Sequence, residues 1–165
     1  AFLKPFLFEN NALEQEWHQA EALVIRYGKS PVDYFKTYED KLLYFSKSHE
    51  GFIAYRTAGN FATVLEEPVC EADDTIKLEI LKEFEAFCKE QGLKPAYYRV
   101  DRSSLLLFEQ LGKKNIIIGQ EARVDLRTFS LEGKDRKSLR NAVNGVLKKG
   151  FILKIYEAPI KEGIL

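Results

Sequence analysis

The chain has 165 residues, of which 45% are hydrophobic and 13% aromatic. This composition suits a globular fold with a buried core and excludes a disordered or collagen-like chain. Its 25 basic and 25 acidic residues balance, so the net charge of the whole chain argues against a polyanion-binding protein. No apolar run approaches the roughly 18–20 residues that a membrane-spanning helix needs.

Helical and extended patterns alternate through the first half of the chain. Apolar residues recur at helical spacing over residues 12–27, and a short element with three aromatic residues follows from residue 30. Three strands are predicted next, the last two of them paired as a hairpin: residues 41–46, 51–57 and 61–65. An apolar stripe predicts a long helix over residues 73–91, with acidic residues favouring its first turn.

The second half continues the alternation and ends in a basic element. We expect a strand at 96–100, a short helix at 103–112 and a long extended segment at 115–126. A basic amphipathic helix over residues 132–149 and a further strand at 151–157 follow. Because strands in hairpins outnumber the helices between them, the predicted fold class is α+β, with a mixed or largely antiparallel sheet flanked by helices.

Residues with metal-binding or nucleophilic side chains are scattered along the sequence. Cys70 and Cys88 form no C-x-x-C pair, and His18 and His49 are far apart. A structural zinc site normally takes four such ligands in paired spacing. We therefore expect two free, buried thiols, no metal and no cofactor. The G-x-S-x-G and G-x-G-x-x-G motifs are also absent from the sequence.

The neutral total conceals an uneven distribution of charge. Residues 132–165 hold eight basic and four acidic residues, which leaves seventeen basic and twenty-one acidic residues in 1–131. Within the predicted basic helix, one row of side chains recurs at every fourth residue: Arg136, Arg140, Asn144 and Lys148. Such a row can bind phosphates through bidentate guanidinium contacts, or it can be a solvated helix face. Periodicity alone leaves both open.

The most distinctive motif is FSLEGKDRKSLRNAVN, at residues 129–144. It resembles a signature of the bacterial phosphatidylglycerol lysyltransferases, the multiple-peptide-resistance-factor family, in their C-terminal catalytic domain. Five further segments resemble the family in the same order, the last of them IGQEARVDL at residues 118–126. The resemblance runs from about residue 27 to residue 159.

This resemblance implies two acetyltransferase-like (GNAT-type) folds in tandem. Residues 1–130 would form the first, and residues 131–165 the opening helix and strand of a second, incomplete one. The implied enzyme transfers an aminoacyl group from aminoacyl-tRNA to a glycerol hydroxyl of phosphatidylglycerol. We expect the transferred group to be lysyl. Its partners would be the aminoacyl-tRNA and phosphatidylglycerol at the cytoplasmic face of the bacterial membrane, and it needs no metal or redox cofactor.

The polar residues of the matched segments are the candidate site. The resemblance suggests that four residues bind tRNA or lipid phosphates: Lys134, Arg136, Arg140 and Asn144. It also suggests that Glu121 or Glu132 is the catalytic residue, which accepts a proton from the hydroxyl or holds the amine. In the structural alternative, Glu121 closes a salt bridge and Glu132 favours the start of the helix.

Three departures from the family pattern and two other functions stay open, and the most important departure is that the family's catalytic domain is about twice the length of this chain. Glu66-Glu67 stands where the family has Gly-Asp, so the turn before Pro68 is expected to differ, and Gly145 replaces a usually basic residue. The implied fold is shared with acyl-CoA-dependent N-acetyltransferases, although the pyrophosphate-binding loop of those enzymes is absent from the sequence. A non-catalytic module that binds tRNA or an anionic membrane through the basic helix would also explain the charge distribution.

Overall fold

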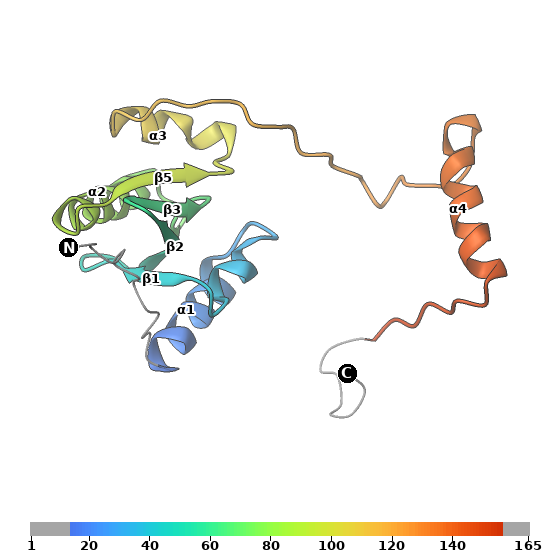
Figure 1. Cartoon of the computed structure of the whole chain (residues 1–165), viewed down its shortest axis with the longest axis horizontal. Coiled ribbons are helices and arrows are strands. Elements are labelled where there is room, and N and C mark those ends of the chain that lie inside the picture. The colour runs from blue at the N-terminus through green and yellow to red at the C-terminus, as the bar shows by residue number, and fades with distance from the viewer. Residues whose placement is uncertain (1–13, 157–165) are drawn as a thin grey trace, which may run out of the picture. The chain divides into compact units, whose positions relative to one another are not determined.

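The computed structural model describes residues 14–156. The chain divides into two compact units, with the boundary between Ile116 and Ile117. The first unit holds the sheet and three α-helices, and the second holds one α-helix between irregular segments (Figure 1). Since the sequence motifs place a boundary at 130/131 instead, the assignment of residues 1–130 and 131–165 to two folds stays a prediction.

The sheet of the first unit is mixed, as the sequence predicted. Its strands follow the order β1-β2-β3-β5, and β4 pairs with β2 on the same edge as β3, beyond the end of β3. All neighbours are antiparallel except β3 and β5, which run parallel with Leu65 opposite Tyr98. The strands are β1 (Leu42–Phe45), β2 (Gly51–Ala58), β3 (Phe61–Leu65), β4 (Val69–Cys70) and β5 (Lys94–Tyr98).

Helices cover both faces of this sheet. The helical elements of the first unit are α1 (Glu14–Tyr27), α2 (Asp74–Glu90), α3 (Leu105–Gln110) and the 3₁₀ turns η1 (Asp33–Thr37) and η2 (Arg102–Ser104). Helix α2 begins where the sequence predicted, because the Asp73 carboxylate accepts hydrogen bonds from the backbone N–H groups of Thr75 (2.7 Å) and Ile76 (3.2 Å). These bonds lower the pKa of Asp73.

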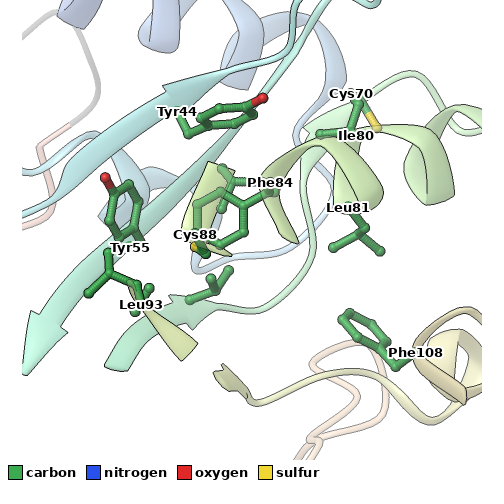
Figure 2. Close-up of a cluster of buried hydrophobic side chains, with 12 residues drawn as sticks. Tyr44, Tyr55, Cys70, Ile80, Leu81, Phe84, Cys88, Leu93 and Phe108 are labelled. Atoms are coloured by element: carbon green, nitrogen blue, oxygen red, sulfur yellow. The ribbon is translucent and has the colours of Figure 1, made fainter. Parts of the chain in front are cut away.

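The alternation of side chains along β2 builds a core on each face. Ile53 and Tyr55 point to the α2 side, where the fully buried Phe84 lies edge-on to Tyr55 with the ring centroids 5.2 Å apart (Figure 2). Phe52 and Ala54 point to the opposite side and pack in the cluster of Ala20 and Leu23 from α1. The two clusters hold α1, the sheet and α2 together as three layers.

Both cysteines are free and buried, as the sequence predicted. Burial raises the pKa of Cys70 to about 11 and that of Cys88 to about 12. Because the thiolate is the reactive form, both side chains serve as core residues and not as nucleophiles.

The second unit consists of η3 (Lys134–Arg136) and α4 (Lys137–Lys148) with extended segments on either side. The basic helix is therefore present, although its first turn is 3₁₀. The structure has no strand at residues 115–126 or at 151–156, so the predicted strand at 151–157 is wrong for its described part; Glu157 lies outside the described residues. A strand is stabilised by hydrogen bonds to a neighbouring strand, and no strand is present in residues 117–156 to pair with these segments.

Candidate functional site

A tight turn fixes the start of the basic helix. Gly133 has φ +87°, a left-handed conformation that glycine adopts without a steric penalty. The Arg140 guanidinium reaches back from α4 and donates hydrogen bonds to the carbonyl oxygens of Leu131 and Gly133, the latter at 2.7 Å. Arg140 thus ties the FSLEGK turn to the helix, a structural contact in addition to any role toward a ligand.

Three of the other predicted residues lie around the same turn. The Arg136 guanidinium stacks over the Phe129 ring, 5.3 Å from the ring centroid, so the first and eighth residues of the motif are in contact. The backbone N–H of Glu132 donates to Ser130 Oγ at 3.3 Å, and the Glu132 side chain is exposed to solvent. Lys134, in η3, is also exposed.

Asn144 completes the predicted row one and two turns along α4 from Arg140 and Arg136. The neighbouring face of the helix is apolar, and all four of its large side chains are exposed: Leu139, Val143, Val146 and Leu147. Helix α4 is thus amphipathic, with a basic face and an uncovered apolar face. The sequence predicted both faces.

Glu121 lies in the extended segment that precedes the turn. It forms an ion pair with Arg123, with 3.2 Å between Oε2 and Nε. Asp125 forms a similar pair with Arg127 at 2.8 Å, and hydrogen bonds from the Arg127 side chain and backbone N–H lower the pKa of Asp125. The salt bridge foreseen in the structural alternative for Glu121 is therefore present.

The structure therefore gathers one part of the candidate site. Glu132, Lys134, Arg136 and Arg140 come together at the junction of the turn and α4, and Asn144 follows on the same helix. Guanidinium and ammonium groups exposed at such a junction can bind phosphate oxygens, and a neighbouring carboxylate can accept a proton. Among residues 14–156, no three side chains of the His, Cys, Asp and Glu types are grouped to hold a metal ion.

Sequence reasoning missed a second polar cluster, at the carboxyl ends of the parallel strands β3 and β5. Glu66 and Arg99 follow these strands, and both have left-handed backbones, with φ +59° and +66°. Their side chains form an ion pair, with 3.7 Å between Arg99 Nη1 and Glu66 Oε1. The Glu66 N–H donates to the Tyr98 carbonyl at 2.8 Å, so the backbone itself helps to hold Glu66 in this conformation.

Lys36 connects this cluster to η1. Its side chain is nearly inaccessible, with the residue 2% exposed, and its Nζ lies 2.6 Å from Asp33 Oδ1 and 2.8 Å from the Glu67 carbonyl oxygen. Burial alone would favour the neutral acid at Asp33. However, the Lys36 charge and hydrogen bonds from Lys36, Ser30 and Lys29 outweigh burial, so the pKa of Asp33 lies below its usual value.

The unusual Glu66-Glu67 pair was the sequence feature that marked this cluster. The resemblance implies a glycine at the position of Glu66, and a glycine would adopt the left-handed φ found there without a steric penalty. In this chain a glutamate takes the position, and its carboxylate pairs with cations from two other segments, at 3.9 Å from Lys36 and 3.7 Å from Arg99. The turn before Pro68 therefore differs from a Gly-Asp turn in its side-chain contacts.

Comparison with known families identifies the relatives of the chain. The family model "Phosphatidylglycerol lysyltransferase, C-terminal" matches residues 21–162. Phosphatidylglycerol lysyltransferase of Staphylococcus epidermidis is 27% identical over 143 residues, which cover 86% of this chain and 17% of the relative. The Staphylococcus aureus enzyme of the same name is 24% identical over 159 residues, which cover 96% of this chain and 19% of the relative.

Two solved structures share the fold. L-PGS from Bacillus licheniformis aligns with a TM-score of 0.74 and 24% identity, covering 96% of this chain and 48% of that one. The C-terminal DUF2156 domain of an Agrobacterium fabrum protein aligns with a TM-score of 0.68 and 24% identity, covering 82% and 42%. The chain therefore spans under half of these solved chains and under a fifth of the two staphylococcal enzymes.

Proposed function

Because the chain belongs to the phosphatidylglycerol lysyltransferase C-terminal family, we propose that it forms part of a catalytic domain that transfers lysyl groups from aminoacyl-tRNA to phosphatidylglycerol. The family match over residues 21–162 carries this proposal. In the proposed arrangement, residues 1–130 are the first of two acetyltransferase-like folds, and residues 131–165 begin the second. The domain works at the cytoplasmic face of the bacterial membrane, where both substrates meet.

The basic residues of the turn and α4 are proposed to bind phosphates. Lys134 and Arg136 are exposed beside the turn, where their charges can approach the tRNA backbone or the lipid phosphate. Arg140 already donates to two carbonyl oxygens, so it acts on the ligand mainly by positioning the turn. Asn144 adds an amide donor and acceptor further along the same helix.

The reaction requires a proton acceptor and an oxyanion stabiliser. A lipid glycerol hydroxyl attacks the ester carbonyl that links the amino acid to the tRNA, a tetrahedral intermediate forms, and the tRNA ribose oxygen leaves with a proton. We assign the proton acceptor to Glu132, because it is exposed and belongs to the same motif as the exposed cations Lys134 and Arg136. Glu121 takes the second place, since its carboxylate is paired with Arg123.

A transfer assay tests the proposal. The full-length protein that contains this chain is mixed with tRNA charged with labelled lysine and with vesicles that contain phosphatidylglycerol. Labelled lipid should form, and both ribonuclease and the replacement of phosphatidylglycerol by phosphatidylcholine should abolish it. Glu132→Gln should lower kcat more than it raises KM, because it removes the proton acceptor without removing a phosphate contact.

Lys82→Ala is the matched control for charge changes, since Lys82 is an exposed residue of α2 in the other unit. It should leave the transfer rate unchanged. The proposal is wrong if the full-length protein forms no labelled lipid with any charged tRNA, and the assignment of Glu132 is wrong if Glu132→Gln keeps the wild-type rate.

A non-catalytic binding module is the second candidate, and the amphipathic form of α4 favours it. A helix with a basic face and an exposed apolar face can bind tRNA or an anionic membrane without any chemistry. Salt-dependent binding of tRNA by the full-length protein, together with a complete absence of labelled lipid in the transfer assay, would establish this function in place of the first.

A further inference from the structure

The 3₁₀ turn η1 displays three aromatic rings on the surface of the first unit. Tyr34 is 65% exposed, and Phe35 and Tyr38 are each 44% exposed. The rings pack on one another edge-to-face, with centroids 5.2 to 6.1 Å apart. We call these three residues the η1 aromatic patch. Large apolar side chains clustered at the surface of a soluble protein mark a site of interaction.

The patch is held from below by the buried charges of the same turn. Asp33 and Lys36 alternate with the exposed aromatic residues and point inward, where the Lys36 Nζ contacts Asp33 Oδ1 and the Glu67 carbonyl oxygen. The Asp33 carboxylate also accepts the backbone N–H groups of Lys29 and Ser30, at 2.7 and 2.8 Å. These contacts anchor the turn beneath the exposed rings.

Charge and shape limit what the patch can bind. Residues 29–41 carry three lysines against two aspartates and one glutamate, and Lys36 is buried, so this segment has no net positive charge to attract a polyanion such as tRNA. Neither of two pockets, of about 470 and 570 Å³, is lined by a residue of the patch. Because the patch lies outside these pockets, its exposed rings suit a deformable partner such as a lipid layer better than a small molecule.

We propose that the η1 aromatic patch inserts into the interfacial layer of a lipid bilayer and holds the domain at the membrane surface. Tyrosine and phenylalanine suit this layer, because the rings reach the acyl boundary while the tyrosine hydroxyl groups stay among headgroups and water. The inference rests on the proposed function for its choice of partner, since a phospholipid substrate must be reached within its bilayer. It assigns the contact to the first unit and not to the basic helix.

Vesicle binding tests the inference without tRNA and without turnover, so its result is independent of the transfer assay. Sedimentation of the protein with phosphatidylcholine vesicles, with and without phosphatidylglycerol, gives a partition coefficient for each composition. Changing Tyr34, Phe35 and Tyr38 together to Ser should lower that coefficient by about tenfold or more. The loss should be similar with both compositions and at high salt, because the contact is apolar.

The matched control changes three scattered, exposed apolar residues of the first unit to Ser: Ile25, Phe61 and Leu106. It should bind vesicles like the wild type, and unchanged circular dichroism should show that both variants are folded. The inference is overturned if the patch variant binds vesicles normally. It is also overturned if that variant instead loses tRNA binding or a dimer of the chain, because the patch then serves nucleic acid or a second copy.

A tryptophan reporter locates the contact. The single tryptophan, Trp17, is replaced by Phe, and Tyr34→Trp then supplies the emission. Insertion predicts a blue shift on addition of vesicles and quenching by lipids with brominated acyl chains. An emission spectrum that vesicles do not change would place the ring outside the bilayer and overturn the inference.

Discussion

The two units of the chain differ in what their apolar side chains contact. In the first unit, Phe84 and its neighbours on α2 are enclosed between the helix and the sheet, and Phe84 has no exposed surface. In the second unit, no residue in 117–156 is buried, and Leu147 of α4 is 60% exposed. The first unit thus contains its own hydrophobic core, whereas α4 presents an apolar face that is available to a partner.

This difference separates stability from binding. Substitutions that lower the free energy of unfolding should concentrate in the first unit, because that free energy comes mainly from apolar burial. Substitutions in the second unit should change the affinity for a partner more than the stability, since α4 is held by local contacts such as those of Arg140. Substitutions in each unit test whether the two units differ in this way.

The largest effect is expected in the α2 core. Phe84→Ala should lower the free energy of unfolding by about 3–5 kcal/mol, because it leaves a cavity among Tyr44, Tyr55 and Phe87. Leu147→Ala on α4 should change it by less than about 0.5 kcal/mol. Urea denaturation followed by Trp17 fluorescence measures both. Equal losses from the two substitutions would contradict the comparison.

Breaking the buried ion pair of Lys36 and Asp33 should lower the free energy of unfolding by a similar or slightly smaller amount. Lys36→Ala leaves the Asp33 carboxylate buried without its cation, at an expected cost of about 3–5 kcal/mol. The double variant Asp33→Leu with Lys36→Met should recover much of this loss, because no charge then remains unpaired. The same urea titration applies, and a single variant as stable as Lys82→Ala would show that the pair is solvated.

The same pair predicts an acid limit to stability. The pKa of Asp33 in the folded protein lies below that of an ordinary aspartate, so the unfolded state binds a proton first as the pH falls. The contribution of ionised Asp33 to the free energy of unfolding is therefore complete above about pH 4, and it is lost as the pH falls through the lowered pKa. Asp33→Asn should flatten this part of the stability profile between pH 5 and 2, measured by thermal unfolding. An unchanged slope would contradict the assignment.

A smaller effect should report the strain at Glu66. Glu66→Ala and Glu66→Gly both remove the contacts with Arg99 and Lys36, but only glycine relieves the left-handed φ of +59°. The glycine variant should be more stable than the alanine variant by about 1 kcal/mol. If alanine is as stable as glycine, the turn relaxes in solution and the conformation at Glu66 is not constrained.

Much of the first unit could be predicted from local pattern. Helix α2 has both an apolar stripe and an N-terminal Asp73, and the β2–β3 hairpin has turn residues between two alternating strands. The parallel pairing of β3 with β5 was not predictable, because partners so far apart leave no local signal. The same is true of β4, which has two residues, pairs with β2 and packs those residues into the two core clusters.

The candidate site shows the same limit. Motif spacing predicted Arg136, Arg140 and Asn144 on one helix; the structure has Arg140 and Asn144 on α4 and Arg136 in the 3₁₀ turn that precedes it. It could not show that Arg140 binds two carbonyl oxygens, because a side chain that folds back on a turn depends on the conformation of Gly133. Nor could it show that Lys36 is buried, since lysine is normally exposed and its partners come from η1 and from the turn after β3.

The salt dependence of tRNA binding tests the central claim most directly, which is that the second unit supplies the phosphate contacts. The full-length protein is compared with a triple alanine variant of Lys134, Arg136 and Lys148, and with a matched triple variant in the first unit of Lys82, Lys89 and Lys114. The triple variant of the second unit should bind tRNA more weakly, and the magnitude of its slope of log K against log salt should fall by roughly two to three. The triple variant of the first unit should keep the wild-type slope. Equal slopes for all three proteins, or a loss confined to the first-unit variant, would contradict the account.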